Sequence, residues 1–271
     1  MDPSGGLRPA SLTLATFNVH LGIDGWGRPF DVVGACRALG ADLLVMQESW
    51  APDGGGPSTA RTVADQLGYS VVAEVAMAHG RLFGPSPTAT SRWGPRLGPW
   101  RSAFRLDGEH RRMRGTGPAP TLGRLGLALL SRLPVRGHTL IPLERLRRDP
   151  ARRTVIGCHL ELADGALAVF GTHMSHITHG SHAQYRRLKD LLPPSTSAAV
   201  LAGDMNLWGP PVNSYLRGWR RAVTAPTWPA YRPHSQLDHV LVTPSVAVLD
   251  ARVGTFAGSD HLPVAVTVAM A

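Results

Sequence analysis

Six short polar clusters each follow an apolar, strand-like run in this sequence, and together they supply carboxylates, amides and imidazoles. The clusters are Asn18, Gln47-Glu48, Thr172-His173, Asp204-Met205-Asn206, Asp238-His239 and Ser259-Asp260-His261. A buried strand that is polar at one end places that end at a sheet edge, where a ligand can reach it. Six repeats of this pattern favour one shared site. Carboxylate and amide oxygens with histidines nearby are suited to binding Mg²⁺ or Mn²⁺ and to handling a charged phosphoester.

Glu48 illustrates the choice between a structural and a metal-binding carboxylate. It follows the apolar run from Leu43 to Met46, so its side chain is expected to emerge from a buried strand. A lone buried glutamate is more often held in a salt bridge, because an unpaired carboxylate is costly to desolvate. However, Asp204 and Asp260 occupy the same kind of position. Several carboxylates at one sheet edge repel each other unless a cation lies among them, which favours a metal site.

Asp204 and Asn206 lie two residues apart, so in extended backbone their side chains point the same way. One interpretation is a carboxylate that deprotonates water beside an amide that holds a phosphoryl oxygen. The alternative is an Asx-turn after a strand. Asp260 precedes His261, which could donate to a phosphate oxygen, and Asp238 is a candidate partner that would orient the His261 imidazole.

Four histidines recur at every third position, a pattern that raises the question of a transition-metal site. They are His173, His176, His179 and His182. This spacing spreads the four rings around a helix, and no thiolate or carboxylate lies among them, so a zinc site is disfavoured. Only His173 ends a strand-like run, and it alone joins the polar clusters.

The segments between the clusters alternate between strand and helix patterns. Expected helices cover 30–39, 58–67 and 182–192, and expected strands cover 12–19, 42–46, 70–76, 125–130, 154–162, 166–172, 198–202, 237–242 and 263–269. Asp31 is a plausible cap for the first helix. Asp164-Gly165 predicts a tight hairpin, which argues against a purely parallel sheet. We expect one α/β domain with mixed sheets over 1–271, in which residues 1–10 are disordered.

Residues 77–122 interrupt this alternation. They are rich in Pro, Gly, Ser and Arg, with nine arginines from Arg81 to Arg124 against only Asp107 and Glu109. Such a stretch is either a substrate-facing flap whose arginines contact phosphate, or an insertion whose arginines are simply solvated. The composition leaves both interpretations open.

The composition permits a sizeable core and favours an anionic partner. The chain has 271 residues, of which 43% are hydrophobic, and a formal net charge of +9. That charge favours nucleic acid, anionic lipid or a phosphorylated small molecule, although a bias toward arginine codons explains it equally well, since Lys189 is the only lysine. Cys36 and Cys158 each lie among apolar residues, which predicts small buried thiols.

No targeting or membrane-spanning segment is evident in the sequence. Residues 1–10 lack the apolar region of a signal peptide, and no apolar run is long enough to cross a bilayer. The expectation is a cytoplasmic protein without membrane insertion, monomeric by default.

Taken in order, the polar clusters resemble the motifs of the endonuclease/exonuclease/phosphatase superfamily, which includes DNase I-like nucleases. The matching motifs are Thr16-Phe17-Asn18-Val19-His20, Gln47-Glu48, Gly171-Thr172-His173, Gly203-Asp204-Met205-Asn206, Leu237-Asp238-His239-Val240 and Ser259-Asp260-His261-Leu262-Pro263. The segment Leu129–Pro134 is also similar to the superfamily's central strand ending in Ser-Arg-x-Pro. Each motif alone is nonspecific, but six in the same order make coincidence improbable.

The resemblance implies a four-layer α/β/β/α sandwich with two mixed, largely antiparallel sheets and a site where the sheets open at one end. It also implies in-line attack of water on phosphorus, with Mg²⁺ or Mn²⁺ as cofactor. By motif, the metal would be held by Asn18, Glu48 and Asp260, with Glu48 the principal ligand. The remaining catalytic residues would be His173, Asp204, Asn206, Asp238 and His261, and the substrate would contact His20 and Arg132.

The implied roles divide the site into two functions. Asp204 would position or deprotonate the attacking water, and Asn206 would orient it or hold the phosphate. His173 and His261 would bind and neutralise the phosphoryl group, with Asp238 supporting His261.

The leading hypothesis is a metal-dependent phosphoesterase acting on phosphodiesters such as nucleic acid. The alternatives are a phosphomonoesterase or a phospholipid or inositol-phosphate hydrolase with the same site, and, less favoured, a non-catalytic anion-binding module. His20 stands where abasic-site endonucleases of this superfamily often carry an acidic residue, which argues against that subtype. Members act on DNA, RNA, inositol phosphates, nucleotides or sphingomyelin, so the resemblance does not name the substrate.

Overall fold

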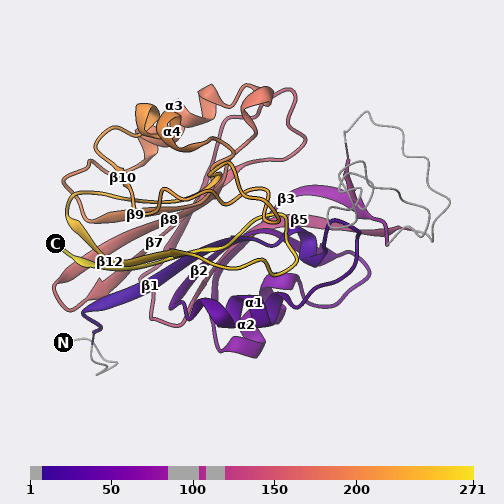
Figure 1. Ribbon diagram of the computed structural model, residues 1–271, viewed down its shortest axis with the longest axis horizontal. Coiled ribbons are helices and arrows are strands. Elements are labelled where there is room, and N and C mark those ends of the chain that lie inside the picture. The colour runs from indigo at the N-terminus through magenta and orange to yellow at the C-terminus, as the bar shows by residue number, and fades with distance from the viewer. Residues whose placement is uncertain (1–7, 85–103, 108–119) are drawn as a thin grey trace.

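Two β-sheets pack face to face in the computed structural model, which describes residues 8–84, 104–107 and 120–271 (Figure 1). In spatial order, the first sheet contains β12 (Val246–Val253), β13 (Val264–Met270), β1 (Ser11–Asn18), β2 (Leu43–Pro52), β5 (Thr121–Ser131), β3 (Ser70–Leu82) and β4 (Phe104–Leu106). The second contains β10 (Arg220–Arg221), β11 (Asp238–Val242), β9 (Ala199–Asp204), β8 (Gly165–His173), β7 (Thr154–Leu162) and β6 (His138–Pro142).

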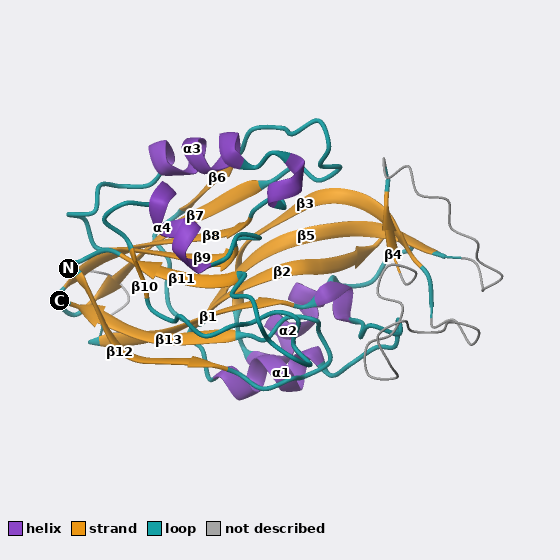
Figure 2. Cartoon of the chain, turned by 45° about the horizontal axis from the view of Figure 1, so that its top comes forward, coloured by secondary structure: helices purple, strands orange, loops and turns teal. Residues whose placement is uncertain are grey.

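Helices cover the outer face of each sheet (Figure 2). The helices are η1 (His20–Gly22), α1 (Val32–Leu39), α2 (Thr59–Leu67), η3 (Ile177–His179), α3 (His182–Leu191) and α4 (Gly209–Tyr215). The α1 and α2 helices pack on the first sheet, and α3 and α4 pack on the second, in two separate apolar cores. A third core fills the space between the sheets, so the layers are α/β/β/α as predicted.

Alternation along the strands explains how one strand serves two cores. In β1, Leu14 faces the core between the sheets, whereas Ala15 and Phe17 face α1 and α2. In β2, Val45 and Met46 divide in the same way. Because successive side chains of a strand point to opposite faces, a strand buried on both sides is apolar along its whole length. The continuous apolar runs in the sequence therefore correspond to the central strands.

The two sheets are mixed, largely antiparallel, and each contains one parallel pair at its centre. β1 pairs with β2 in parallel, and β8 pairs with β9 in parallel, whereas the other neighbouring strands run antiparallel. The hairpin predicted at Asp164-Gly165 joins antiparallel β7 and β8. β8 and β9 end together at His173 and Asp204, and β1 ends at Asn18 opposite Gln47 in the longer β2, so each pair brings polar residues together.

The predicted helix ends have the expected capping interactions. The Asp31 side chain accepts a hydrogen bond from the Gly34 amide at 2.7 Å, and Ser58 accepts from the Arg61 amide at 3.2 Å. Gly68 ends α2 in the left-handed region, with φ of 71°. Side-chain caps satisfy amides that lack a partner in the first helical turn, which explains why both helices begin where they do.

Two predictions about the less regular parts of the chain have mixed outcomes. Part of 77–122 is strand, since β3 continues to Leu82 and pairs with β4, and β5 begins at Thr121. The rest of the predicted flap, at 85–103 and 108–119, lies outside the described residues, as do 1–7 of the predicted disordered start.

Cys36 and Cys158 are buried and free, as predicted. Among the described residues, no helix is long and apolar enough to span a membrane.

Candidate active site

The ends of the two parallel strand pairs form the centre of the site. Asn18 at the end of β1 lies opposite Gln47 in β2, and His173 at the end of β8 lies opposite Asp204 at the end of β9. Asp238, the first residue of β11, lies opposite Asp204 on its other side. Polar residues that are distant in sequence therefore meet at one edge, where the sheets face each other.

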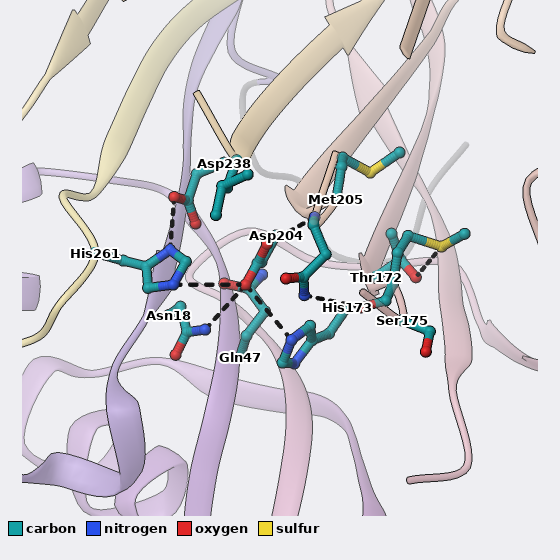
Figure 3. Close-up of polar contacts among 12 residues, drawn as sticks. Asn18, Gln47, Thr172, His173, Ser175, Asp204, Met205, Asp238 and His261 are labelled. Carbon is teal, nitrogen blue, oxygen red and sulfur yellow. Dashed lines mark hydrogen bonds and ion pairs between the residues drawn. The ribbon is translucent and has the colours of Figure 1, made fainter. Parts of the chain in front are cut away.

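Asp204 is the residue that joins these strand ends (Figure 3). Its Oδ2 atom accepts a hydrogen bond from Asn18 Nδ2 at 3.1 Å, and lies 3.5 Å from His173 Nε2 and 3.8 Å from His261 Nε2. Its Oδ1 atom accepts from the Asn206 amide at 2.9 Å. One carboxylate thus contacts residues from both sheets and from the segment between β12 and β13.

A second carboxylate fixes the orientation of His261. His261 Nδ1 donates to Asp238 Oδ2 at 2.8 Å, which leaves Nε2 directed at Asp204. Asp238 is itself held by its amide, which donates to Thr227 Oγ1 at 3.1 Å. The backbone of His261 is held by Ser259, whose hydroxyl accepts from the His261 amide and donates to the Asn18 carbonyl. The imidazole is therefore positioned from two directions.

The two histidines that contact Asp204 have opposite electrostatic surroundings. Burial alone would lower the pKa of His261, but Asp238, Asp260 and Asp204 raise it well above its usual value. For His173, burial lowers the pKa well below the usual range, and Arg153 and His261 lower it further. At neutral pH, His261 is therefore an imidazolium and His173 is neutral.

The pKa of Asp204 lies close to neutrality. Burial raises it, His261 opposes that rise, and Asp238 adds to it, for a value of about 7. A carboxylate with such a pKa can accept a proton at neutral pH more readily than an ordinary aspartate.

Glu48 reaches the site from an irregular position in β2. The pairing of β2 with β5 shifts register between Gln47 and Ser49, and Glu48 between them has φ of 58°. A β-bulge of this kind re-aims a side chain out of the regular alternation. Burial raises the pKa of Glu48, His20 lowers it, and nearby Asp260 raises it. Glu48 and Asp260 therefore lie close enough to repel each other.

Strained backbone is concentrated at this edge of the molecule. In the described part of the chain, the non-glycine residues with positive φ are His20, Leu21, Glu48 and Asn206. His20, Leu21 and Asn206 follow strands that end at the site, and Glu48 lies at the irregular position within β2. Such conformations persist only where surrounding structure enforces them, and they are common at functional sites.

Of the residues predicted from the sequence, one lies elsewhere. Arg132 donates to the carbonyls of Leu67 and Ala41, and its guanidinium lies 4.3 Å from the centre of the Tyr69 ring. β5 runs antiparallel to β2, so its last residue is at the opposite end of the sheet from Glu48. Arg132 is thus a packing residue rather than the predicted substrate contact, a distinction that requires knowing the strand direction.

His20, by contrast, lies beside the other predicted residues. Its amide donates to Asn18 Oδ1 at 3.0 Å, and its ring Nδ1 donates to the Ile23 carbonyl at 2.9 Å. Its contact with Asn18 helps to orient the amide that donates to Asp204.

The sequence matches the model of the Endonuclease/Exonuclease/phosphatase family over residues 15–261. The chain belongs to this family. Members are phosphoester hydrolases that generally use divalent metal ions. No curated protein matches the chain.

Solved structures with the same fold extend over nearly the whole chain. An endonuclease/exonuclease/phosphatase from Beutenbergia cavernae has a TM-score of 0.66 and 20% identity, covering 97% of this chain and 72% of that one. The human Nocturnin catalytic domain with bound sulfate has a TM-score of 0.60 and 17% identity, covering 98% and 95%. TDP2 from D. rerio, complexed with a single-strand DNA product, has a TM-score of 0.58 and 13% identity, covering 96% and 99%.

The donor set of this Endonuclease/Exonuclease/phosphatase family member fits a hard divalent cation. Glu48 Oε2 and Asp260 Oδ1 are both buried and have no hydrogen-bond partner in the described structure. Two such oxygens at one edge are costly without a cation between them. A second group, Asp204, Asp238 and His261, has potential ligand atoms within 4.8 Å of one another. There, however, His261 Nδ1 is already bonded to Asp238, and the ring is positively charged, which disfavours a cation.

Two residues of the site were not anticipated from the sequence. Trp228 Nε1 donates to Asp260 Oδ2 at 3.3 Å and so orients this carboxylate. Arg153, near His173, is paired with buried Asp149 at 2.8 Å, and its Nη1 atom is buried without a hydrogen-bond partner in the described part of the chain. Trp228 lies in an irregular segment, and Arg153 is one of several arginines in a short stretch, so neither stands out by composition.

Proposed function

We propose that this family member is a divalent-metal-dependent phosphodiesterase with nuclease-like activity, which hydrolyses its substrate by in-line attack of an activated water. The observation that carries the proposal is the convergence on Asp204 of two histidines with opposite pKa shifts, beside two unpartnered buried carboxylate oxygens. That arrangement combines a proton acceptor, a fixed positive charge and a cation site within one edge of the sandwich.

Asp204 is the proposed acceptor of the proton from the attacking water. Its pKa of about 7 suits general-base chemistry at neutral pH. Asn206 follows at the same turn, and its Nδ2 atom donates to the Met174 carbonyl at 3.0 Å, which directs the amide oxygen away from that contact. We assign Asn206 to orienting the water or a phosphoryl oxygen.

His261 is the proposed permanent positive charge opposite the phosphoryl group. Its ion pair with Asp238 keeps Nδ1 protonated, so Nε2–H is available as a donor. Charge that develops on phosphoryl oxygens in the transition state would meet a donor that is already oriented. His173, neutral and 3.5 Å from the same carboxylate, would offer a ring N–H to a phosphoryl oxygen without adding charge.

Glu48, Asp260 and Asn18 would hold the metal, with Mg²⁺ or Mn²⁺ the ion that prefers such oxygen donors. When bound, the cation polarises phosphoryl oxygens and stabilises negative charge on them. Trp228 keeps the Asp260 carboxylate directed into the site by its hydrogen bond to Oδ2.

The proposed substrate class is a phosphodiester of a nucleic acid. A net charge of +9 favours a polyanion. Two structural relatives are described with a bound sulfate anion and with a single-strand DNA product, which supports an anionic substrate for this chain.

The test is hydrolysis by the purified protein with Mn²⁺ or Mg²⁺ and with EDTA. Substrates are plasmid DNA, single-stranded RNA, an inositol phosphate and sphingomyelin. We expect metal-dependent cleavage of a nucleic acid, and its loss in Glu48→Gln. Glu161→Gln is the matched control. Glu161 lies on β7, away from the site, where it forms ion pairs with Arg8 and Arg136. Turnover of only the phospholipid or inositol phosphate would reassign the substrate, and no turnover of any substrate would refute the proposal.

A further inference from the structure

A hollow of about 430 Å³ adjoins the candidate active site and has no role in the chemistry described above. One wall is formed by Trp208, two residues after Asn206, and another by Gln236, two residues before Asp238. Both walls therefore continue directly from strand ends that carry catalytic side chains. The hollow therefore lies beside the edge of the sheet that carries Asp204 and Asp238.

Trp208 is the dominant apolar side chain of the hollow. It is 52% exposed, in contrast to Trp50 and Trp219, which are both buried. A large aromatic ring left in solvent beside an active site gains energy when a flat partner covers it. Trp208 is the N-cap residue of α4, so its backbone is held at the start of a helix.

The other side chains that line the hollow are polar and partly fixed. Arg221 Nη1 donates to Gln236 Oε1 at 2.8 Å, and Gln236 Nε2 donates to the Val223 carbonyl at 2.7 Å. A guanidinium has five N–H donors, so this bond leaves Arg221 with capacity for a ligand. The guanidinium lies close against Gly209, since a Cβ at this position would lie 1.8 Å from Arg221 Nη1.

A chain of contacts connects the hollow with the metal-binding carboxylates. His234 lines the hollow and meets the Trp228 ring edge-on, with 5.7 Å between ring centres. Trp228 in turn donates to Asp260. A ligand beside His234 is therefore separated from the Asp260 carboxylate by one indole ring.

We propose that this hollow is a nucleobase subsite, in which Trp208 stacks on a base next to the scissile phosphodiester and Arg221 and His234 contact the polar edge of that base. The proposal rests on the phosphodiesterase function above and specifies its substrate as a polynucleotide. Aromatic stacking combined with guanidinium and imidazole donors suits a flat, polar ring. A lipid chain would face these polar side chains along most of its length, which disfavours a phospholipid.

Equilibrium binding in EDTA tests the subsite independently of cleavage. The probes are a fluorescein-labelled oligothymidylate and a strand of equal length built from abasic units, which has the same phosphates and no bases. We expect Trp208→Ala to weaken oligothymidylate binding about 10-fold and Trp208→Phe to retain most of it, because stacking on one aromatic ring contributes at this level. Binding of the abasic strand is expected to change little.

Two controls separate the subsite from general effects. Leu249→Ala removes another large exposed apolar side chain, 61% exposed on β12, and should leave both affinities unchanged. Comparison with dTMP separates a free nucleotide from a base within a strand, and the proposal requires tighter binding of the strand. Equal binding of dTMP and the strand, or a Trp208→Ala effect that is absent or equal for the two strands, would overturn the subsite.

The binding and cleavage results have distinguishable meanings. Base-dependent binding through Trp208 without metal-dependent cleavage would refute the hydrolase and leave the subsite. Cleavage with no dependence on Trp208 would leave the hydrolase and refute the subsite. Circular dichroism of each variant checks that a loss of binding does not arise from unfolding.

Discussion

His173 and His261 approach the same Asp204 carboxylate from opposite sides, yet the protein prepares them for different protonation states. On the His261 side, Asp238 bonds to the ring, and Asp260 and Asp204 add negative charge. On the His173 side, Arg153 and His261 add positive charge, and the ring Nδ1 atom is buried without a hydrogen-bond partner among the described residues. Both histidines are nearly fully buried, so burial alone does not distinguish them.

The difference shows that neighbouring charges decide which histidine carries a proton. Burial favours the neutral form of both rings, and carboxylates reverse this preference only at His261. Two histidines at one carboxylate can therefore divide the work, one as a fixed charge and the other as a neutral hydrogen-bond group. The following experiments remove one contribution to that difference at a time.

The largest expected effect is the removal of the charge beside His261. Asp238→Asn should lower the His261 pKa and let its ring adopt the wrong tautomer, so kcat on the preferred phosphodiester should fall about 10³- to 10⁴-fold. Steady-state kinetics and an NMR titration of the His261 ring measure the two effects. Asp250→Asn, at an exposed ion pair with Arg252, is the control. A kcat within tenfold of wild type would show that catalysis does not depend on the charge that Asp238 places beside His261.

The next effect concerns the positive charge beside His173. Although burial opposes it, Arg153 lowers the pKa of Asp149, so the two form an ionised pair in the interior. Arg153→Met leaves the Asp149 carboxylate buried without its partner, and the free energy of unfolding should fall by about 3–5 kcal/mol. The His173 pKa should rise, since a positive charge has been removed. Urea unfolding and NMR titration provide the measurements.

A double variant separates the lost ion pair from lost packing. Asp149→Leu combined with Arg153→Met removes both charges and should recover much of the stability, because no unpaired charge remains. Arg136→Met, at a solvent-exposed ion pair with Glu161, should cost less than about 1 kcal/mol. Equal losses in the buried and exposed variants would contradict a special role for the Arg153 pair.

A third histidine extends the comparison to stability. His239 follows Asp238 in β11, but its Nε2 atom donates to the Leu207 and Gln236 carbonyls rather than to a carboxylate. Burial lowers its pKa to about 4. The unfolded state, with a histidine pKa of about 6.5, binds a proton first as pH falls, so stability is present above pH 6.5 and is lost toward pH 4.

The expected loss is about 3 kcal/mol between pH 6.5 and pH 4. His239→Gln removes this titration, so the difference in unfolding free energy between wild type and variant should shrink over that range. Chemical denaturation at several pH values provides the measurement. A difference that is independent of pH would show that His239 binds a proton equally well in the folded and unfolded states, which would contradict the lowered pKa.

The buried strands of the fold were predictable from the sequence, and the less buried edge strands were not. The central strands were predicted from their apolar runs, whereas β4, β6, β10 and β12 were missed. These four are the outermost strands of the two sheets. Edge strands bury little surface, so their sequences carry a weak apolar pattern, and their position is decided by pairing with a neighbour.

The site residues were predictable where a polar side chain ends a buried strand. Asn18, His173 and Asp204 were found on that basis, and the structure brings them together. Arg132 also follows a strand but lies at the wrong end of it. Arg153 was missed because it lies just before β7 rather than at the end of a strand, and only the folded arrangement places it near His173. Sequence patterns identify strand ends, but the topology determines which ends converge.

The smallest expected effect tests how the segment that carries His261 is attached to the first sheet. The Ser259 hydroxyl donates to the Asn18 carbonyl at 2.6 Å and accepts from the His261 amide at 3.1 Å, so it joins the end of β1 to the segment that carries His261. Ser259→Ala leaves a buried carbonyl and amide without this partner and should cost about 1–2 kcal/mol in unfolding free energy. Because Asp238 still pairs with His261, the raised pKa of this histidine should persist. A His261 pKa that falls to its usual value in Ser259→Ala would mean that backbone placement, rather than the neighbouring carboxylates, maintains the difference between the two histidines.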